Sequence, residues 1–112
     1  MSVLASSSNT VAQRLEALAQ LYQQGQPSEL IERTLDKVLA YEAETCRAQL
    51  AQLQADLAEF EQRYGVPSDE FYRRFQAGQT DDRMDYVEWA SLVQMADNAQ
   101  KRLRLLTGEG LA

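Results

Sequence analysis

Acidic side chains are the residues of this sequence whose types and spacing come closest to a site for chemistry. Asp81, Asp82, Asp85 and Glu88 gather in one short stretch. On a helix, steps of four and three residues would let Asp81, Asp85 and Glu88 present oxygens to Mg²⁺ or Ca²⁺, or act as an acid–base pair. Carboxylates are also favoured at a helix start by the helix dipole, and no glycine-bearing calcium loop or nucleophile accompanies these. We favour the interpretation that these carboxylates mark the start of a helix, and we keep a metal-dependent hydrolase as the weaker alternative.

The other reactive or charged groups do not indicate catalysis. Cys46 is the single cysteine and the chain has no histidine, so it lacks an internal disulfide, imidazole ligands and a near-neutral base. Lys101, Arg102 and Arg104 form a basic cluster that is typical of the last turns of a helix. With 17 acidic and 11 basic side chains, the net charge of -6 disfavours nucleic acids and anionic membranes. We therefore expect that the protein is not an enzyme and binds no cofactor. Its negative charge predicts a basic protein as its partner.

Length and composition predict one helical domain. The 112 residues suit a single core, and only 5 Gly and 2 Pro leave few places to turn. We expect a disordered Ser-rich tail over residues 1–9 and a single helical domain over residues 10–108. The opening resembles no signal peptide and no apolar run reaches membrane-spanning length, so a cytoplasmic location is the simplest expectation.

Two long helices carry matching apolar seams. A helix from about Glu29 to Tyr64 has apolar residues at alternating steps of four and three: Cys46, Leu50, Leu53, Leu57, Phe60 and Tyr64. A helix from about Arg83 to Leu106 has a similar series: Trp89, Leu92, Ala96, Ala99, Leu103 and Leu106. The seam of the first helix does not extend back to Leu35, which indicates a stutter and a different neighbour for its amino-terminal third.

Two short helices complete the pattern. Thr10 and Gln13 have the spacing of a capping box, and apolar residues then recur at steps of four and three: Val11, Leu15, Leu18 and Tyr22. The second short helix has Ser68 as its predicted N-cap, and Phe71 and Phe75 share one face. The predicted fold is all-α: a long, coiled-coil-like antiparallel helical hairpin, with a short helix at the bend and a short N-terminal helix.

The buried area of a bare hairpin is marginal against conformational entropy, so we expect the two short helices and a second protomer to complete the burial in a helical bundle. Small residues lie roughly opposite the seam of the long helix, and they are either a dimerisation stripe or merely good helix formers: Ala48, Ala51, Ala55 and Ala58. The aromatic residues near the bend form either a core knot or, with one edge open, an anchor for a partner. The predicted partner-binding surface consists of Phe71, Phe75, Asp81, Asp82, Asp85, Glu88 and Trp89.

Three runs of sequence carry a family resemblance: residues 60–65 (FEQRYG), residues 68–78 (SDEFYRRFQAG), and Asp81-Asp82 and Asp85 followed by Glu88-Trp89. This pattern, within about residues 35–106, resembles small all-helical bacterial proteins that are frequent in cyanobacteria. Many are uncharacterised and are encoded beside genes for toxin-like proteins. The resemblance implies an antitoxin-like protein that binds and masks a partner, although no antitoxin DNA-binding motif occurs. A self-associating structural coiled-coil module is the main alternative.

Overall fold

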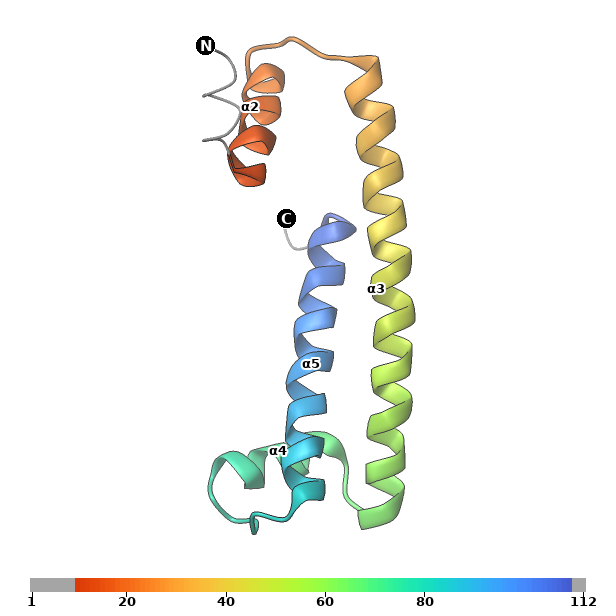
Figure 1. Cartoon of the computed structure of the whole chain (residues 1–112), viewed down its shortest axis with the longest axis vertical. Coiled ribbons are helices and arrows are strands. Elements are labelled where there is room, and N and C mark those ends of the chain that lie inside the picture. The colour runs from red at the N-terminus through yellow and green to blue at the C-terminus, as the bar shows by residue number, and fades with distance from the viewer. Residues whose placement is uncertain (1–9, 110–112) are drawn as a thin grey trace. The chain divides into compact units, whose positions relative to one another are not determined.

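The computed structural model describes residues 10–109, which form helices and no strand. The helices are α2 (Val11–Gln23), α3 (Glu29–Tyr64), α4 (Ser68–Gln76) and α5 (Met84–Leu106) (Figure 1). The predicted all-helical class is thereby confirmed for this range, whereas the predicted tail lies outside the described residues. Within the same range, no helix combines the length and the apolar character that crossing a membrane requires.

The chain divides into two compact units, Met1–Asp36 and Lys37–Ala112. The boundary falls inside α3, so that helix gives its first turns to the first unit and the remainder to the second. The single domain expected over residues 10–108 stays a prediction.

The first unit contains α2 and the start of α3, joined by a tight turn. The capping box of α2 is present, because the Gln13 N–H donates to Thr10 Oγ1 at 3.1 Å and the Thr10 N–H donates to Gln13 Oε1 at 2.8 Å. Gly25 supplies the left-handed backbone, with φ of 77°, at which the chain leaves α2. The Tyr22 hydroxyl then accepts from the Ser28 N–H at 3.0 Å and lies 2.8 Å from the Ser28 carbonyl oxygen. Polar contacts therefore fix this turn.

The second unit is built on contacts between α3 and α5. One cluster of its core consists of seam residues of both helices: Cys46, Leu50, Leu53 and Ala99, with Leu92, Ala96, Leu103 and Leu106 packed against them. The Cys46 thiol donates to the carbonyl oxygen of Ala99, late in α5, at 3.2 Å. Phe60, near the end of α3, stacks instead on Trp89, early in α5. The two helices therefore run in opposite directions within this unit (Figure 1).

The start of α4 differs from the prediction in one detail. Ser68 is not the N-cap but the first helical residue, and the N-cap is Pro67, which has no side-chain hydrogen bond to offer. Glu61 of α3 supplies the missing acceptor, since its carboxylate accepts from the Ser68 N–H at 2.8 Å. The Ser68 hydroxyl is thus left for another role.

Candidate functional site

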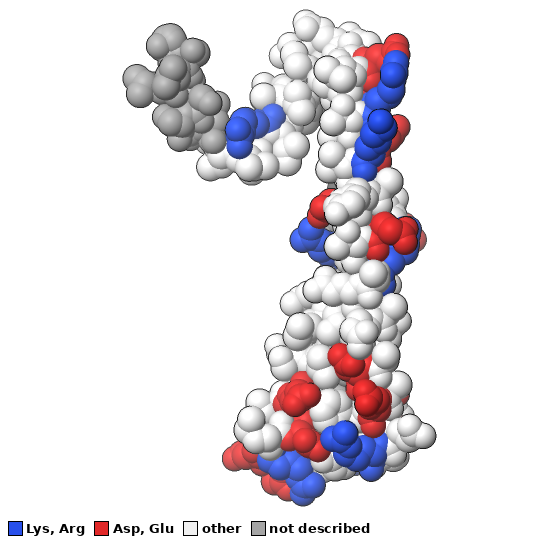
Figure 2. Space-filling model, turned by 45° about the vertical axis from the view of Figure 1, so that its right-hand side comes forward, with Lys and Arg blue, Asp and Glu red and all other residues white. Residues whose placement is uncertain are grey.

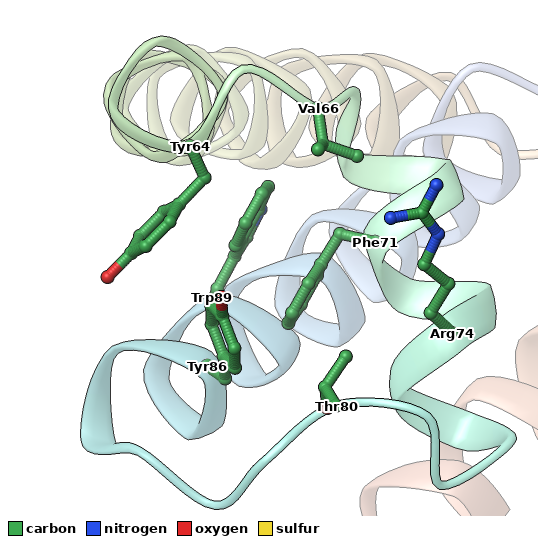
Figure 3. Close-up of a pocket in the computed structure, with 7 residues that line it drawn as sticks. All are labelled: Tyr64, Val66, Phe71, Arg74, Thr80, Tyr86 and Trp89. Carbon is green, nitrogen blue, oxygen red and sulfur yellow. The ribbon is translucent and has the colours of Figure 1, made fainter.

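Trp89 is the centre of an aromatic cluster formed by Phe60, Tyr64, Phe71, Tyr86 and Trp89. The indole stacks on Phe71 with ring centroids 3.8 Å apart and 2° between the ring planes, and on Phe60 at 5.6 Å and 11°. Tyr64 and Tyr86 also lie against the indole (Figure 3). Trp89 is 1% exposed. The aromatic residues at the bend therefore form a core knot.

The polar edge of the indole is also satisfied, which removes Trp89 from the candidate surface. The Trp89 Nε1–H donates to the Ser68 hydroxyl at 3.0 Å, and no buried side-chain nitrogen or oxygen in residues 10–109 lacks a partner. Phe71 is buried as well, and Phe75 is half-buried beside it. Because the chain's own side chains cover Trp89 and Phe71, they cannot anchor a partner in this structure. The candidate surface is therefore restricted to the residues around Trp89 and Phe71.

A small cavity of about 90 Å³ adjoins the aromatic cluster. Figure 3 shows the residues that line it: Tyr64, Val66, Phe71, Arg74, Thr80, Tyr86 and Trp89. Its one cation, Arg74, pairs with Glu70 at 2.5 Å. Small-molecule sites usually measure about 300 to 1,000 Å³, so this cavity is too small to hold a ligand of that kind.

A larger hollow of about 420 Å³, here called the acidic cleft, lies between α3 and α5. Its lining residues are Asp56, Glu59, Phe60, Arg63, Asp85 and Glu88. Four of these side chains are carboxylates and one is a guanidinium. Figure 2 shows acidic side chains gathered over the end of the second unit where α4 lies, with basic side chains beside them. The cleft is therefore a place of concentrated negative charge.

Asp85 is held firmly at one side of the cleft. Its Oδ2 atom accepts from the Tyr64 hydroxyl at 2.5 Å and from Arg63 Nη1 at 3.0 Å. These two donors stabilise the ionised carboxylate and hold the pKa of Asp85 below its usual value, while the same hydrogen bond raises the pKa of Tyr64. Arg63 also lies over the Phe60 ring, 5.2 Å from its centroid. The one guanidinium of the cleft is thus already paired.

The remaining carboxylates of the cleft are not neutralised. Within residues 10–109, Asp56, Glu59 and Glu88 take part in no ion pair, and Asp56 accepts only from the neutral Gln52 amide at 3.1 Å. With Asp85 and Arg63 cancelling one another, the cleft keeps the charge of three carboxylates. A cationic side chain of another molecule could form charge-assisted hydrogen bonds with these three carboxylates.

Of the acidic residues predicted at the start of α5, only Asp85 and Glu88 are brought together, because both line the acidic cleft. Asp81 pairs with Arg83 through contacts of 2.9 and 2.8 Å, which lower the pKa of Asp81, whereas Asp85 pairs with Arg63. Asp82 is exposed and Glu88 lines the cleft. No group of three or more possible metal ligands occurs in residues 10–109, so the metal-dependent hydrolase gains no ligand set there. Arg83 also covers the Tyr86 ring at 4.6 Å.

The predicted dimerisation stripe is exposed along its whole length: Ala48, Ala51, Ala55 and Ala58 all lie on the surface of α3. This exposure fits a stripe and an ordinary solvated helix face equally well. Its role stays a prediction.

Sequence reasoning missed two of the cleft residues, Asp56 and Glu59. The signal for them is their place beside the seam, since they flank Leu57 and Phe60 on α3. In a helix pair such flanking positions face the charged residues of the partner helix. Given an antiparallel pairing in which Phe60 meets Trp89, these carboxylates are expected close to Asp85 and Glu88.

Comparison of the chain with models of protein families, with curated proteins and with solved structures gives no match.

Proposed function

We propose that the chain is a non-catalytic protein–protein interaction module whose acidic cleft docks a basic segment of a partner protein. The observation that carries the proposal is the charge of the cleft, where Asp56, Glu59 and Glu88 have no cationic partner among the described residues. An arginine side chain entering the cleft would form charge-assisted hydrogen bonds with these carboxylates. Charge complementarity of this kind gives specificity and speeds association.

The rigidity of the walls supports the same proposal. Phe60 lies in the cleft and also stacks on Trp89, so this wall is continuous with the packed aromatic cluster. The contacts of Asp85 with Arg63 and Tyr64 hold the opposite wall against α3. A preformed cleft loses little side-chain freedom when a partner binds, which lowers the entropic cost of association.

The proposed biological role is antitoxin-like, with the protein masking a basic, toxin-like partner in the cytoplasm. The family resemblance within residues 35–106 supports this role, as does the net charge of -6. We expect the product of the neighbouring gene to arrest growth when expressed alone and co-expression of this chain to relieve the arrest. Growth arrest that this chain does not relieve would contradict the masking role.

The cleft itself is tested with a defined probe, an arginine-rich helical peptide, titrated into the labelled protein by NMR. Asp56→Lys with Glu88→Lys changes the cleft, while Glu16→Lys with Glu44→Lys makes the same change of net charge at exposed positions elsewhere. We expect the cleft variant to bind the peptide at least about tenfold more weakly, which is 1.4 kcal/mol, and the control to bind nearly as well as the wild type.

The location of the chemical-shift changes distinguishes docking from general attraction. Specific ion pairs in the cleft should confine the chemical-shift changes to residues around Glu59, and the affinity should fall as salt rises. Equal weakening of binding in the two double variants would mean that only net charge matters, and the cleft would then not be the docking site.

A further inference from the structure

Arg63 supplies the only cation that lines the acidic cleft, and the residues of the cleft hold its guanidinium. Arg63 Nη1 donates to Asp85 Oδ2 at 3.0 Å, and the guanidinium carbon lies 5.2 Å from the centroid of the Phe60 ring. The chain thus shows how its cleft binds a guanidinium: a carboxylate accepts from the planar group while an aromatic ring packs against it. A partner's arginine that used Asp85 and Phe60 would have to replace Arg63.

The contacts of Arg63 are of a kind that exchanges readily. The Arg63 side chain is 55% exposed and that of Asp85 is 38% exposed. An exposed ion pair contributes little to stability, because water competes for both charges and salt screens their attraction. Arg63 also lies in the last turn of α3, where the helix dipole favours a cation whether or not it is paired. Arg63 can therefore leave Asp85 at low cost.

A second carboxylate of the cleft can receive Arg63. Glu59 lies four residues earlier on α3 and takes part in no ion pair within residues 10–109. A glutamate four residues before a cationic residue is the favoured order for an ion pair along a helix. Rotation of the Arg63 side chain can thus exchange Asp85 for Glu59 while the helix stays intact.

Asp85 and Phe60 stay in place when Arg63 moves. Asp85 Oδ2 also accepts from the Tyr64 hydroxyl at 2.5 Å, and the half-buried Tyr64 ring stacks on Trp89. Phe60 is 6% exposed and stacks on the same indole. The aromatic cluster therefore positions both contact groups independently of Arg63. Their arrangement remains suited to another guanidinium.

We propose that Arg63 is a built-in competitor in the acidic cleft: its guanidinium occupies the place of an arginine of the basic partner and moves to Glu59 when that arginine binds. Because this role presupposes that the cleft docks a basic segment, it rests on the proposed function. A planar guanidinium can pair with a carboxylate and stack on a ring at once, whereas the ammonium group of lysine is a compact, strongly hydrated charge. The partner therefore anchors through arginine, and its other cations pair with Asp56 and Glu88.

The competition is tested by titrating the full chain with the arginine-rich helical peptide and with the same peptide in which lysine replaces every arginine. An exposed ion pair and an exposed cation–π contact each change an equilibrium constant by a factor of about two to five. Arg63→Gln should therefore bind the arginine peptide roughly tenfold more tightly than the wild type does. The lysine peptide should gain at most about threefold, because an ammonium group cannot replace both contacts.

Two further variants separate competition from net charge. Arg47→Gln removes the same charge from a residue of α3 that is 53% exposed and lies outside the cleft, so it should tighten either peptide by no more than about threefold. Arg63→Lys keeps the charge but loses the planar group, so it should bind the arginine peptide about threefold more tightly than the wild type. Arg63→Gln binding no more tightly than Arg47→Gln, or Arg63→Lys binding like the wild type, would overturn the competition.

A second measurement uses the wild-type chain and needs no substitution. When the arginine peptide saturates the cleft, the NMR contacts between the Arg63 side chain and the Phe60 ring should disappear, and contacts between a peptide arginine and the same ring should replace them. A saturated complex in which Arg63 keeps its contacts with Phe60 would overturn the competition and leave the docking of a basic segment intact. Binding by neither the wild type nor Arg63→Gln would overturn both, whereas binding by Arg63→Gln alone would support both.

Discussion

Replacing Trp89 by alanine should remove a large part of the stability of the second unit. The side chain is 1% exposed and stacks on Phe60, Tyr64 and Phe71, so its loss leaves a cavity that these rings cannot refill. Deleting a buried aromatic side chain of this size costs about 3 to 5 kcal/mol. A unit the length of Lys37–Ala112 has a free energy of unfolding of roughly 4 to 11 kcal/mol in total.

Urea unfolding, followed by far-ultraviolet circular dichroism, measures this loss without relying on the missing indole. Trp89→Phe should cost less, about 1 to 2 kcal/mol, because the ring stack remains and only the Nε1–H bond to Ser68 and some volume are lost. Met95→Ala, at a residue that is 46% exposed, is the control and should change the stability by less than about 0.5 kcal/mol. If Trp89→Ala were as mild as the control, the aromatic cluster would not be the centre of the core.

Two further predictions concern titration and reactivity. Because the pKa of Asp85 is lowered in the fold, the ionised carboxylate stabilises the folded state above the usual pKa of aspartate. This contribution disappears as the pH falls toward the lowered pKa. Asp85→Asn should therefore be less stable than the wild type at neutral pH, and the difference in stability should shrink below about pH 4. Urea midpoints at neutral and acidic pH check this, and a difference that grew in acid would contradict it. Cys46, which is 2% exposed, should react with a thiol reagent only as the second unit unfolds, so that the rate rises with urea; fast reaction in native buffer would count against its burial.

The core of the second unit could be predicted from the sequence because its packing follows the local period of the chain. Cys46, Leu50 and Leu53 recur at helical spacing, and the structure buries all three beside Ala99. Trp89 was expected in the matching seam of the helix from about Arg83 to Leu106, and it is the most completely buried large side chain of the described residues. A period of three and four residues is a property of one helix, and so it can be read without knowing the partner helix.

The acidic cleft could not be predicted in the same way, because it depends on which turns of two helices meet. Asp56 and Glu88 are far apart in the sequence and come together only through the packing of α3 on α5. The acidic residues at the start of α5 suggested a shared site that the structure does not contain. Asp81 and Asp85 have the spacing of such a site, but each forms an ion pair with a different arginine. Spacing predicts which residues share a helix face, whereas the cations that lie nearby in the folded chain determine what those residues contact.

The break in the seam of the long helix lies close to the boundary between the two compact units. The seam that begins at Cys46 does not extend back to Leu35, and the boundary between the two units falls just after Leu35, between Asp36 and Lys37. A stutter in the apolar frame locally unwinds the supercoil, so the seam that packs on α5 within the second unit is not continued at Leu35. The second part is covered by α5, whereas the first part shares an apolar groove with α2, which contributes no buried residue. A helix that changes its frame in this way is suited to joining two units whose apolar faces are packed differently.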